Sequence, residues 1–393
     1  MKSKMQSESA TTYEMFIGGS WVPSHTGRNY PVFNPASGQV LAHVPKGDRE
    51  DVRGAVDAAK RAFEAPSWRN MDPSKRGRLL VKLAQGLRDK MADFAKLETM
   101  NNGKPLGQAK GDMAMAARHF EYFAGLADKI EGSTIPVPGN RLDYTVKEPL
   151  GVTAHIVPWN YPLVMAARSM APALAAGNTV VAKPASFTPL TLLKLAELCK
   201  EVGFPDGTVN VLTGGGEDVG GSLVRDPDVK LTAVTGSVET GVKVMQDASQ
   251  NLSKVVLELG GKNPNIVFGD ADLEKATKGV LSGIFTNGGQ MCWAGSRLLV
   301  DSKIKDRFLE TLVQGANAMK LGNGLLPETS MGPLVADSHR KRVAEYVDVG
   351  RDEGAVVATG GAIPKDEDLS KGYYYSPTIL DEVSQDMKVA REE

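Results

Sequence analysis

The spacing of apolar residues changes along the chain and predicts its elements. Short alternating runs at Met15–Val22 and Tyr30–Val44, broken by Gly and Pro, predict hairpin strands. From Arg49 the apolar residues recur at helical spacing, with a second helix that carries Leu79–Leu97 and a third from about Leu106 to Leu126. We interpret these helices as scaffold, because they contain no obvious catalytic cluster.

Two polar segments interrupt this pattern. The first dozen residues are predicted to form a flexible arm. Segment 132–149 is punctuated by Gly and Pro, and its residues 143–147 alternate as in a strand. Such an excursion is typical of an arm that contacts a partner and equally of an ordinary surface hairpin, and the residues alone leave both open.

From Gly151 short apolar strands alternate with helices. The strands are predicted at 151–157, 179–184, 208–212, 230–235 and 254–261, and the helices at about 162–176, at 192–202, and after Gly214 and Gly236. This alternation indicates a parallel sheet covered by helices on both faces. Strands at 266–268 and 297–300, with a helix at about 273–285, begin a second α/β region.

Composition narrows the class of protein. The chain has 393 residues, 41% apolar and 24% charged, with a net charge of −1. This length suits two or three domains, and the charge balance disfavours electrostatic binding to nucleic acid or an anionic membrane. Two cysteines fit a reducing compartment, no apolar run reaches the ~20 residues of a membrane span, and the N-terminus lacks a signal-peptide core. We therefore expect a cytoplasmic α/β protein, to which we assign no metal site.

Two residues are candidates for covalent chemistry and proton transfer. Cys292 lies in the polar, glycine-bearing loop NGGQMCWAGSR, where a thiol can reach a substrate. Glu258 ends the apolar strand VVLELGG, and burial there would raise its pKa towards that of a general base. A glutamate at a strand end can also simply reach water or pair with Lys254 or Lys262.

Two further polar residues follow strands. Asn160, in VPWNYP, could donate its amide to an oxyanion, or it could serve as a turn residue or helix N-cap. Lys183 ends the strand TVVAKP, where the ligand crevice of a parallel sheet would let it reach a ribose hydroxyl. The alternative for Lys183 is a solvent-exposed lysine at a strand end.

Two glycine-rich turns could approach a phosphate. TGGGEDVGG contains Gly214 and Gly216, and VTGSVETG contains Gly236 and Ser237. Glycine lets backbone N–H groups approach an anion, and a helix N-terminus favours negative charge. Neither turn has the G-x-G-x-x-G spacing, and glycine at a strand-to-helix turn also has purely steric uses.

Five distinctive stretches follow one another along the chain: PWNYP, AGNTVVAKPA, VTGSVETG, LELGGKNP and GQMCWAGSR. Their order and separations agree with those of one enzyme family. The chain closely resembles the NAD(P)-dependent aldehyde dehydrogenase superfamily over nearly its whole length, and it looks most like the betaine-aldehyde branch. The resemblance implies an α/β fold with a Rossmann-type parallel-sheet coenzyme domain (1–131 and 150–258), an oligomerisation arm (132–149) and an α/β catalytic domain (259–393). It also implies a homodimer or homotetramer at full length.

The resemblance also implies a role for each candidate. Cys292 would attack the aldehyde and form a thiohemiacetal, with the oxyanion held by the Asn160 side chain and the Cys292 backbone N–H. After hydride transfer to the nicotinamide, Glu258 would activate the water that hydrolyses the thioester. The implied NAD(P)-binding residues are Val157, Pro158, Trp159, Lys183, Ser186, Gly214, Gly216, Gly236, Ser237, Leu259, Gly260 and Glu393.

The sequence departs from its relatives at four places. Ser186 stands where strictly NAD-preferring members often carry a glutamate that repels a 2′-phosphate, so we expect use of both NAD and NADP. Arg168 replaces an aromatic residue, and a cation repels a quaternary ammonium, so we expect an uncharged aliphatic or aromatic aldehyde in a funnel with Tyr161 and Trp293. Met291 precedes Cys292 and selects no particular substrate. The family continues beyond the final REE, so we expect a C-terminally incomplete catalytic domain.

Two alternative functions stay open. In a coenzyme A-acylating enzyme the acyl group would pass to coenzyme A, but such relatives typically lack a glutamate like Glu258. An inactive fragment, or a structural recruit of the fold, would not need Cys292, Glu258 and Asn160 together.

Overall fold

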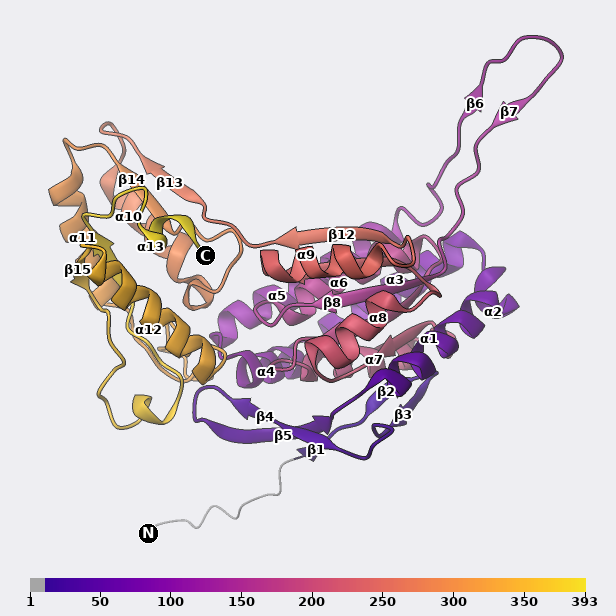
Figure 1. The fold of residues 1–393 in the computed structure, drawn as a ribbon, viewed down its shortest axis with the longest axis horizontal. Helices are drawn as coiled ribbons and strands as arrows, with labels where there is room; N and C mark the ends of the chain where they lie inside the picture. Colours follow the sequence, from indigo (N-terminus) through magenta and orange to yellow (C-terminus); the bar gives the residue numbers. More distant parts are fainter. Residues whose placement is uncertain (1–10) are drawn as a thin grey trace.

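A computed structural model describes residues 11–393 and contains a large sheet whose core is parallel (Figure 1). Its order is β12-β11-β8-β9-β10-β2-β3, in which the five strands from β12 to β10 are parallel. The parallel strands are β8 (Val152–Val157), β9 (Thr179–Pro184), β10 (Val209–Val211), β11 (Val229–Gly236) and β12 (Lys254–Leu259). The predicted parallel sheet is confirmed.

Strand β8 lies in the middle of this parallel set. From β8 the chain proceeds outward through β9 and β10, and then crosses to β11 and β12 on the other side of β8. The order of strands therefore reverses between β8 and β11. In an open α/β sheet, the crevice at the carboxyl ends beside such a reversal is where ligands bind.

The N-terminal hairpin extends this sheet. Strands β2 (Met15–Ile17) and β3 (Ser20–Val22) pair antiparallel, as predicted, and Phe16 of β2 pairs with Val211 of β10. The second predicted hairpin, β4 (Asn29–Asn34) with β5 (Gln39–Pro45), forms a separate small sheet. Local alternation predicts a hairpin, but it cannot predict which distant strand the hairpin joins.

Helices cover both faces of the large sheet, because successive strand residues point to opposite sides. Val180 and Ala182 of β9 pack into the larger core with the helices α3, α5, α6 and α7, whereas Val181 packs on the other face with α1. The helices of this body are α1 (Arg49–Glu64), α2 (Pro66–Arg69), α3 (Pro73–Asp89), α4 (Met91–Asn102), α5 (Leu106–Ala124), α6 (Pro162–Ala175), α7 (Leu190–Val202), α8 (Ser222–Arg225) and α9 (Val238–Ala248).

Two helix predictions need correction. The stretch Leu79–Leu97 is not one helix, because α3 ends at Asp89 and α4 begins at Met91. Leu87 and Phe94, on either side of the break, are both buried in the same core, which explains why the apolar period continues across it. The helix predicted after Gly214 is a π-helical turn, Gly216–Gly221, followed by the single turn α8.

A second, smaller α/β region lies at the left of Figure 1. It is built around the parallel pair β13 (Pro264–Val267) and β14 (Arg297–Val300) and the antiparallel pair β15 (Val356–Thr359) and β16 (Ile379–Asp381). Its helices are α10 (Leu273–Phe285), α11 (Lys305–Asn317), α12 (Asp337–Asp352) and α13 (Lys388–Arg391), with short 3-10 turns at Thr286–Gly289 and Leu369–Lys371. Val267, Val280 and Phe308 contribute to its core.

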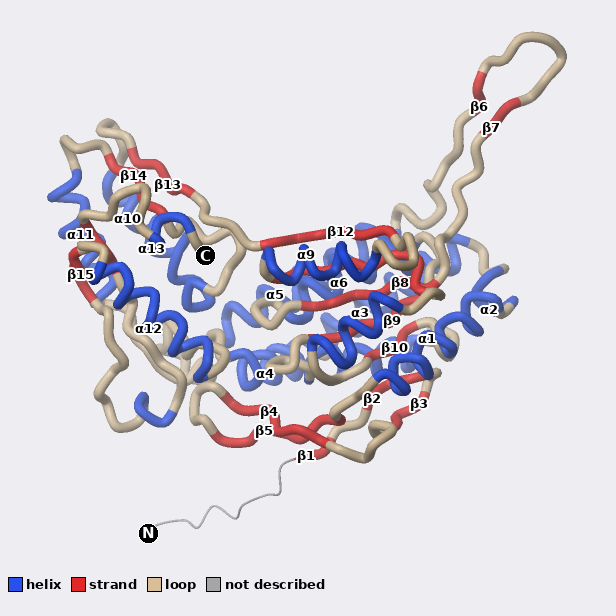
Figure 2. The backbone as a smooth tube through the Cα atoms, viewed as in Figure 1, coloured by secondary structure: helices blue, strands red, loops and turns tan. Residues whose placement is uncertain are grey.

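The segment 132–149 projects away from the body as a long hairpin (Figures 1 and 2). Only β6 (Thr134–Ile135) and β7 (Asp143–Tyr144) pair within it. At the N-terminus, Thr11–Thr12 form β1 and pair with β5, so these two residues do not belong to a flexible arm; residues 1–10 lie outside the described part. No helix within residues 11–393 is long and apolar enough to cross a membrane.

Candidate functional site

The carboxyl ends of β8, β11 and β12 open into a cleft of about 580 Å³ between the sheet and the second α/β region. Loops from both parts of the molecule line it. The lining includes the predicted site residues Pro158, Trp159, Asn160, Gly236, Ser237, Glu258, Leu259, Gly260, Cys292 and Glu393. The strand order therefore brings together residues that are up to 235 positions apart in the chain (393 − 158).

Cys292 lies on a loop whose backbone carbonyls accept hydrogen bonds from two asparagine side chains, Asn263 and Asn160. The loop begins with three residues in left-handed conformation, Asn287, Gly288 and Gly289, with φ of 51°, 64° and 78°. The Asn263 Nδ2 donates to the backbone carbonyl of Cys292 at 2.9 Å. This support presents a half-buried thiol to the cleft.

The surroundings of Cys292 favour the neutral thiol. Burial raises its pKa, and the carboxylates of Glu393 and Glu258 act in the same direction, whereas the Arg168 guanidinium lowers the pKa. The thiolate is the nucleophilic form of cysteine. At neutral pH this thiol therefore needs a base, or a positive charge nearby, to react.

The Asn160 side chain faces the Cys292 loop. Its Nδ2 donates to the backbone carbonyl of Gln290 at 2.9 Å, and its Oδ1 accepts from the Tyr161 N–H at 3.0 Å. An amide carries two N–H donors, so one stays available for an oxyanion in the cleft. Asn160 does not occupy the N-cap of α6, which is Tyr161.

Glu258 is not buried, contrary to the expectation from its apolar strand. Strand β12 alternates exposed and half-buried residues, and the Glu258 side chain lies on the exposed face with 47% of its surface accessible. Its Oε1 lies 2.6 Å from Nη2 of Arg168 on α6. The partner of the carboxylate is therefore neither Lys254 nor Lys262, but a residue 90 positions earlier (258 − 168).

The three predicted funnel residues lie at different depths. Trp293, beside Cys292, is 63% exposed. The Arg168 side chain is 41% exposed and reaches the cleft through its pair with Glu258. The Tyr161 ring is half-buried, and burial raises the pKa of its phenol. None of the three is part of the cleft lining itself.

A second group of predicted residues lies at the ends of β9 and β10, apart from this cleft lining. Lys183 is buried, so it is not an exposed strand-end lysine, and burial lowers its pKa to about 8. Ser186 Oγ donates to the carbonyl of Gly214 at 2.9 Å. Gly214 has φ of 146°, and a Cβ there would lie 2.5 Å from Val219, so this glycine has a steric role. Gly216, also in this turn, is exposed, whereas Val157, the last residue of β8, is a core residue.

A model of the aldehyde dehydrogenase family matches residues 21–393. The chain belongs to this family. It is 45% identical over 381 residues to betaine aldehyde dehydrogenase of Bacillus subtilis (strain 168), which covers 96% of this chain and 78% of that protein. It is 42% identical to hydroxyisobutyraldehyde dehydrogenase of Mycolicibacterium austroafricanum, over 100% of this chain and 77% of that one.

Solved structures agree with this assignment. The structure of betaine aldehyde dehydrogenase from Staphylococcus aureus in complex with NAD+ matches with a TM-score of 0.95 and 41% identity, over 97% of this chain and 76% of that one. An NAD+ complex of an aldehyde dehydrogenase from Bacillus cereus also has a TM-score of 0.95, at 43% identity. The aldehyde dehydrogenase fold is confirmed, and the protein is an NAD(P)-dependent aldehyde dehydrogenase that oxidises aldehydes.

The residues of this aldehyde dehydrogenase fit a dinucleotide. The buried Lys183 ammonium has one hydrogen bond, to the carbonyl of Pro184 at 3.1 Å, which leaves donors for ribose hydroxyls. Ser237 is the N-cap of α9 and accepts from the Thr240 N–H at 3.2 Å, so the free N–H groups of the first turn can meet a pyrophosphate. The Glu393 carboxylate lies directly against Gly260, so the side chain of the last residue reaches this part of the cleft.

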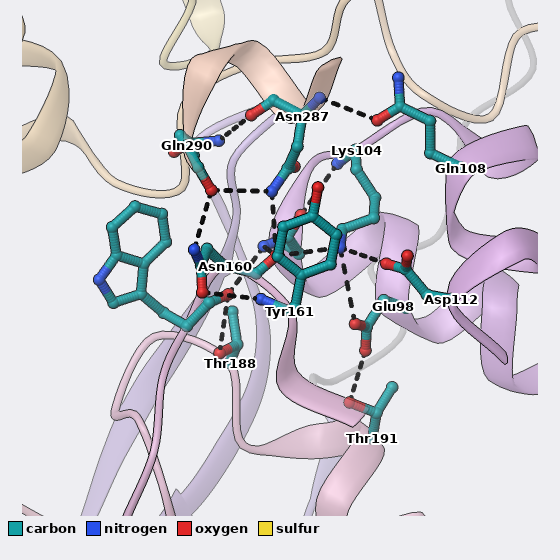
Figure 3. Close-up of polar contacts among 12 residues, drawn as sticks. Glu98, Lys104, Gln108, Asp112, Asn160, Tyr161, Thr188, Thr191, Asn287 and Gln290 are labelled. Atoms are coloured by element: carbon teal, nitrogen blue, oxygen red, sulfur yellow. Dashed lines mark hydrogen bonds and ion pairs between the residues drawn. The ribbon is translucent and has the colours of Figure 1, made fainter. Parts of the chain in front are cut away.

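Sequence reasoning missed several residues that support this aldehyde dehydrogenase site. Asn102 Nδ2 donates to the carbonyl of Trp159 at 2.8 Å. Figure 3 shows Lys104 beside Asn160, and Lys104 Nζ donates to the Asn160 carbonyl at 2.9 Å. The helices before residue 126 are thus not scaffold alone. The polar run Asn-Asn-Gly-Lys between two apolar helices was the available signal. His339 packs on Trp159 with 4.8 Å between the ring centroids, and no sequence signal pointed to this contact.

A metal centre and a second reactive thiol are the two other kinds of reactive group that bear on the chemistry of this fold. Across residues 11–393 no three His, Cys, Asp or Glu side chains are grouped to hold a metal ion. Cys199 is fully buried in α7, and burial raises its pKa, which agrees with a packing role.

Proposed function

We propose that this enzyme converts an aldehyde to the carboxylic acid through a covalent intermediate on Cys292. The observation that carries the proposal is that the Cys292 thiol, the Asn160 amide and the Glu258 carboxylate face one cleft at the carboxyl ends of β8, β11 and β12. A nucleophile, an oxyanion donor and a base are the three groups that acyl chemistry needs.

In the first half-reaction the Cys292 thiol passes its proton to solvent water, and the thiolate Sγ bonds to the carbonyl carbon. The carbonyl π electrons move to oxygen, and the free N–H of the Asn160 amide and the Cys292 backbone N–H stabilise that oxyanion. Bound NAD(P)+ supplies the acceptor for the hydride of this adduct. Loss of the hydride leaves a thioester on Cys292.

In the second half-reaction Glu258 accepts a proton from water, and the resulting hydroxide attacks the thioester carbon. The C–S bond breaks, so the carboxylic acid leaves and the thiolate of Cys292 is restored. The Arg168 guanidinium, 2.6 Å from Glu258, orients the carboxylate for this step.

The test is NADH formation across a panel of aldehydes, with the product identified. A free carboxylic acid formed without coenzyme A supports the proposal. A strict requirement for coenzyme A would favour the acylating reaction, and inactivity towards every aldehyde would favour a structural recruit.

Substrate preference follows from Arg168. Its charge lies beside the base, where an aromatic ring would attract a quaternary ammonium. We expect kcat/KM for an uncharged aldehyde such as benzaldehyde to exceed that for betaine aldehyde by about tenfold or more, because a lost cation–π contact costs ~1–2 kcal/mol. In the Arg168→Met variant the ratio of the two kcat/KM values should decrease, because the repelling positive charge is gone. A wild-type preference for betaine aldehyde would contradict this assignment.

Coenzyme preference follows from Ser186. Its hydroxyl donates to Gly214 and presents no negative charge to a 2′-phosphate. We expect activity with both NAD+ and NADP+, and Ser186→Glu should shift the preference towards NAD+. The measurement is the ratio of the two kcat/KM values. A wild-type preference for NAD+ beyond about a thousandfold, ~4 kcal/mol, would overturn this expectation.

We also propose the division into a coenzyme domain (1–131 and 150–258), an arm (132–149) and a catalytic domain (259–393). The boundary between the coenzyme and catalytic domains is supported by the sheets, because β12 belongs to the large sheet and β13 pairs with β14 in another. The arm carries exposed apolar side chains, with Leu142 at 75% and Tyr144 and Val146 also exposed, which suit a contact between copies in a homodimer or homotetramer. An arm deletion that keeps the molar mass of the wild-type assembly would contradict this role.

A further inference from the structure

A fully buried lysine lies behind the Asn160 loop. Lys104, in the turn between α4 and α5, has no exposed side-chain surface, and its Nζ lies 2.5 Å from Asp112 Oδ2 and 3.9 Å from Glu98 Oε1 (Figure 3). The same Nζ donates to the backbone carbonyl of Asn160 at 2.9 Å and lies 4.1 Å from the centre of the Tyr161 ring. Two of the four contacts, those with Asp112 and with the Asn160 carbonyl, are hydrogen bonds and therefore directional.

Stability alone does not account for such a cluster. Removing charges from water is costly, and replacing a buried ion pair by apolar residues is often neutral or stabilising. Burial raises the pKa of both carboxyl groups, that of Glu98 to about 7, while the charge of Lys104 opposes both shifts. Thr191 Oγ1 donates to the other oxygen of Glu98 at 2.6 Å. Because burying these charges costs free energy, we look for a role of the cluster other than stability.

The contacts of Lys104 restrain the peptide that carries the oxyanion donor. Lys104 holds the carbonyl of the peptide unit between Asn160 and Tyr161, and the N–H of the same unit donates to Asn160 Oδ1 at 3.0 Å. The plane of that peptide therefore determines where Oδ1 sits, and with it the direction of Nδ2 towards the Cys292 loop. Asn287 Nδ2, from that loop, donates to the same carbonyl at 3.0 Å.

We propose that Lys104, held by Asp112, is a positioning residue that aims the Asn160 amide at the reacting oxygen. This inference rests on the proposed function, because it assigns the oxyanion to Asn160. Lys104 does not contact the substrate in this arrangement, so it acts through Asn160.

The first test compares Lys104→Met with the double variant Lys104→Met/Asp112→Leu. We expect the single variant to lose about 10–100-fold in kcat with little change in the KM for NAD+, since a small misplacement of a catalytic group is this costly. The double variant also removes the Asp112 carboxylate, which the single variant leaves without its hydrogen-bonded partner, and should recover melting temperature without recovering kcat. If kcat returns together with stability, Lys104 is merely structural. Lys110→Met, on the exposed face of α5, is the matched control and should keep wild-type kcat.

The second test is a double-mutant cycle with Asn160→Ala. If Lys104 acts through Asn160, then Lys104→Met should change kcat less than about twofold once Asn160 is absent, because effects through a shared partner are not additive. Full additivity would overturn the positioning role while leaving the proposed function intact. Wild-type turnover by Asn160→Ala would instead overturn the oxyanion assignment and this inference with it.

Discussion

Replacing Cys292 by alanine is expected to lower kcat/KM for aldehyde oxidation by at least about 10⁴-fold, on the scale of other lost covalent nucleophiles. The methyl group cannot bond to the carbonyl carbon, so neither the hydride-donating adduct nor the thioester can form. The measurement is steady-state NADH formation with the best aldehyde of the panel. The matched control is Cys199→Ala, which removes the other thiol from a buried position in α7 and should retain turnover.

Alkylation gives an independent readout of the same residue. Burial and nearby carboxylates raise the pKa of Cys292. The rate of inactivation by iodoacetamide, which follows the thiolate fraction, should therefore still increase with pH above about pH 9, where an ordinary thiol is already largely ionised. Labelling should map to Cys292 and not to Cys199. Wild-type turnover in Cys292→Ala, or inactivation that tracks Cys199, would refute the nucleophile assignment.

Replacing Glu258 by glutamine is expected to reduce steady-state turnover by about 10²–10⁴-fold, the usual contribution of a general base. Its effect should fall on thioester hydrolysis, so a rapid burst of NADH close to one equivalent per active site should persist. Glutamine keeps an oxygen acceptor for Arg168, which limits disturbance of the 2.6 Å contact. Stopped-flow absorbance resolves the burst from the slow phase.

A surface glutamate provides the control for Glu258. Glu274 pairs with Lys278 on the exposed face of α10, and Glu274→Gln should leave both phases unchanged. Loss of the burst together with turnover in Glu258→Gln would assign Glu258 to activation of the thiol instead. Unchanged turnover would remove it from the mechanism.

Much of the fold could be predicted from local patterns. The apolar runs around β8, β9 and β11 and the helix Leu273–Phe285 lie where the sequence placed them, because each element is set by the period of its own residues. The break between α3 and α4 was missed because both helices bury one continuous apolar stripe. The joining of β2 to β10 was missed because strand pairing across about 195 positions leaves no local signal (211 − 16).

In the site, too, single residues could be predicted from local sequence, whereas their contacts with distant segments could not. Sequence motifs singled out Cys292, Glu258 and Asn160 as candidates, since each lies in a loop or at a strand end from which a side chain can reach a substrate. The partners of these residues did not follow from the motifs. For Glu258 the sequence offered Lys254 or Lys262 only as alternative partners, whereas the fold pairs it with Arg168 from α6.

The sequence by itself determined the family chemistry, the periodicity of the elements and the strand ends that bear polar groups, because these are encoded in residue types and short spacings. Only the tertiary structure decided that β8, β11 and β12 end at one cleft, that Arg168 meets Glu258, and that Lys104 is buried against the Asn160 carbonyl. These are contacts between distant segments. They depend on the packing of whole helices and strands, which no local pattern specifies.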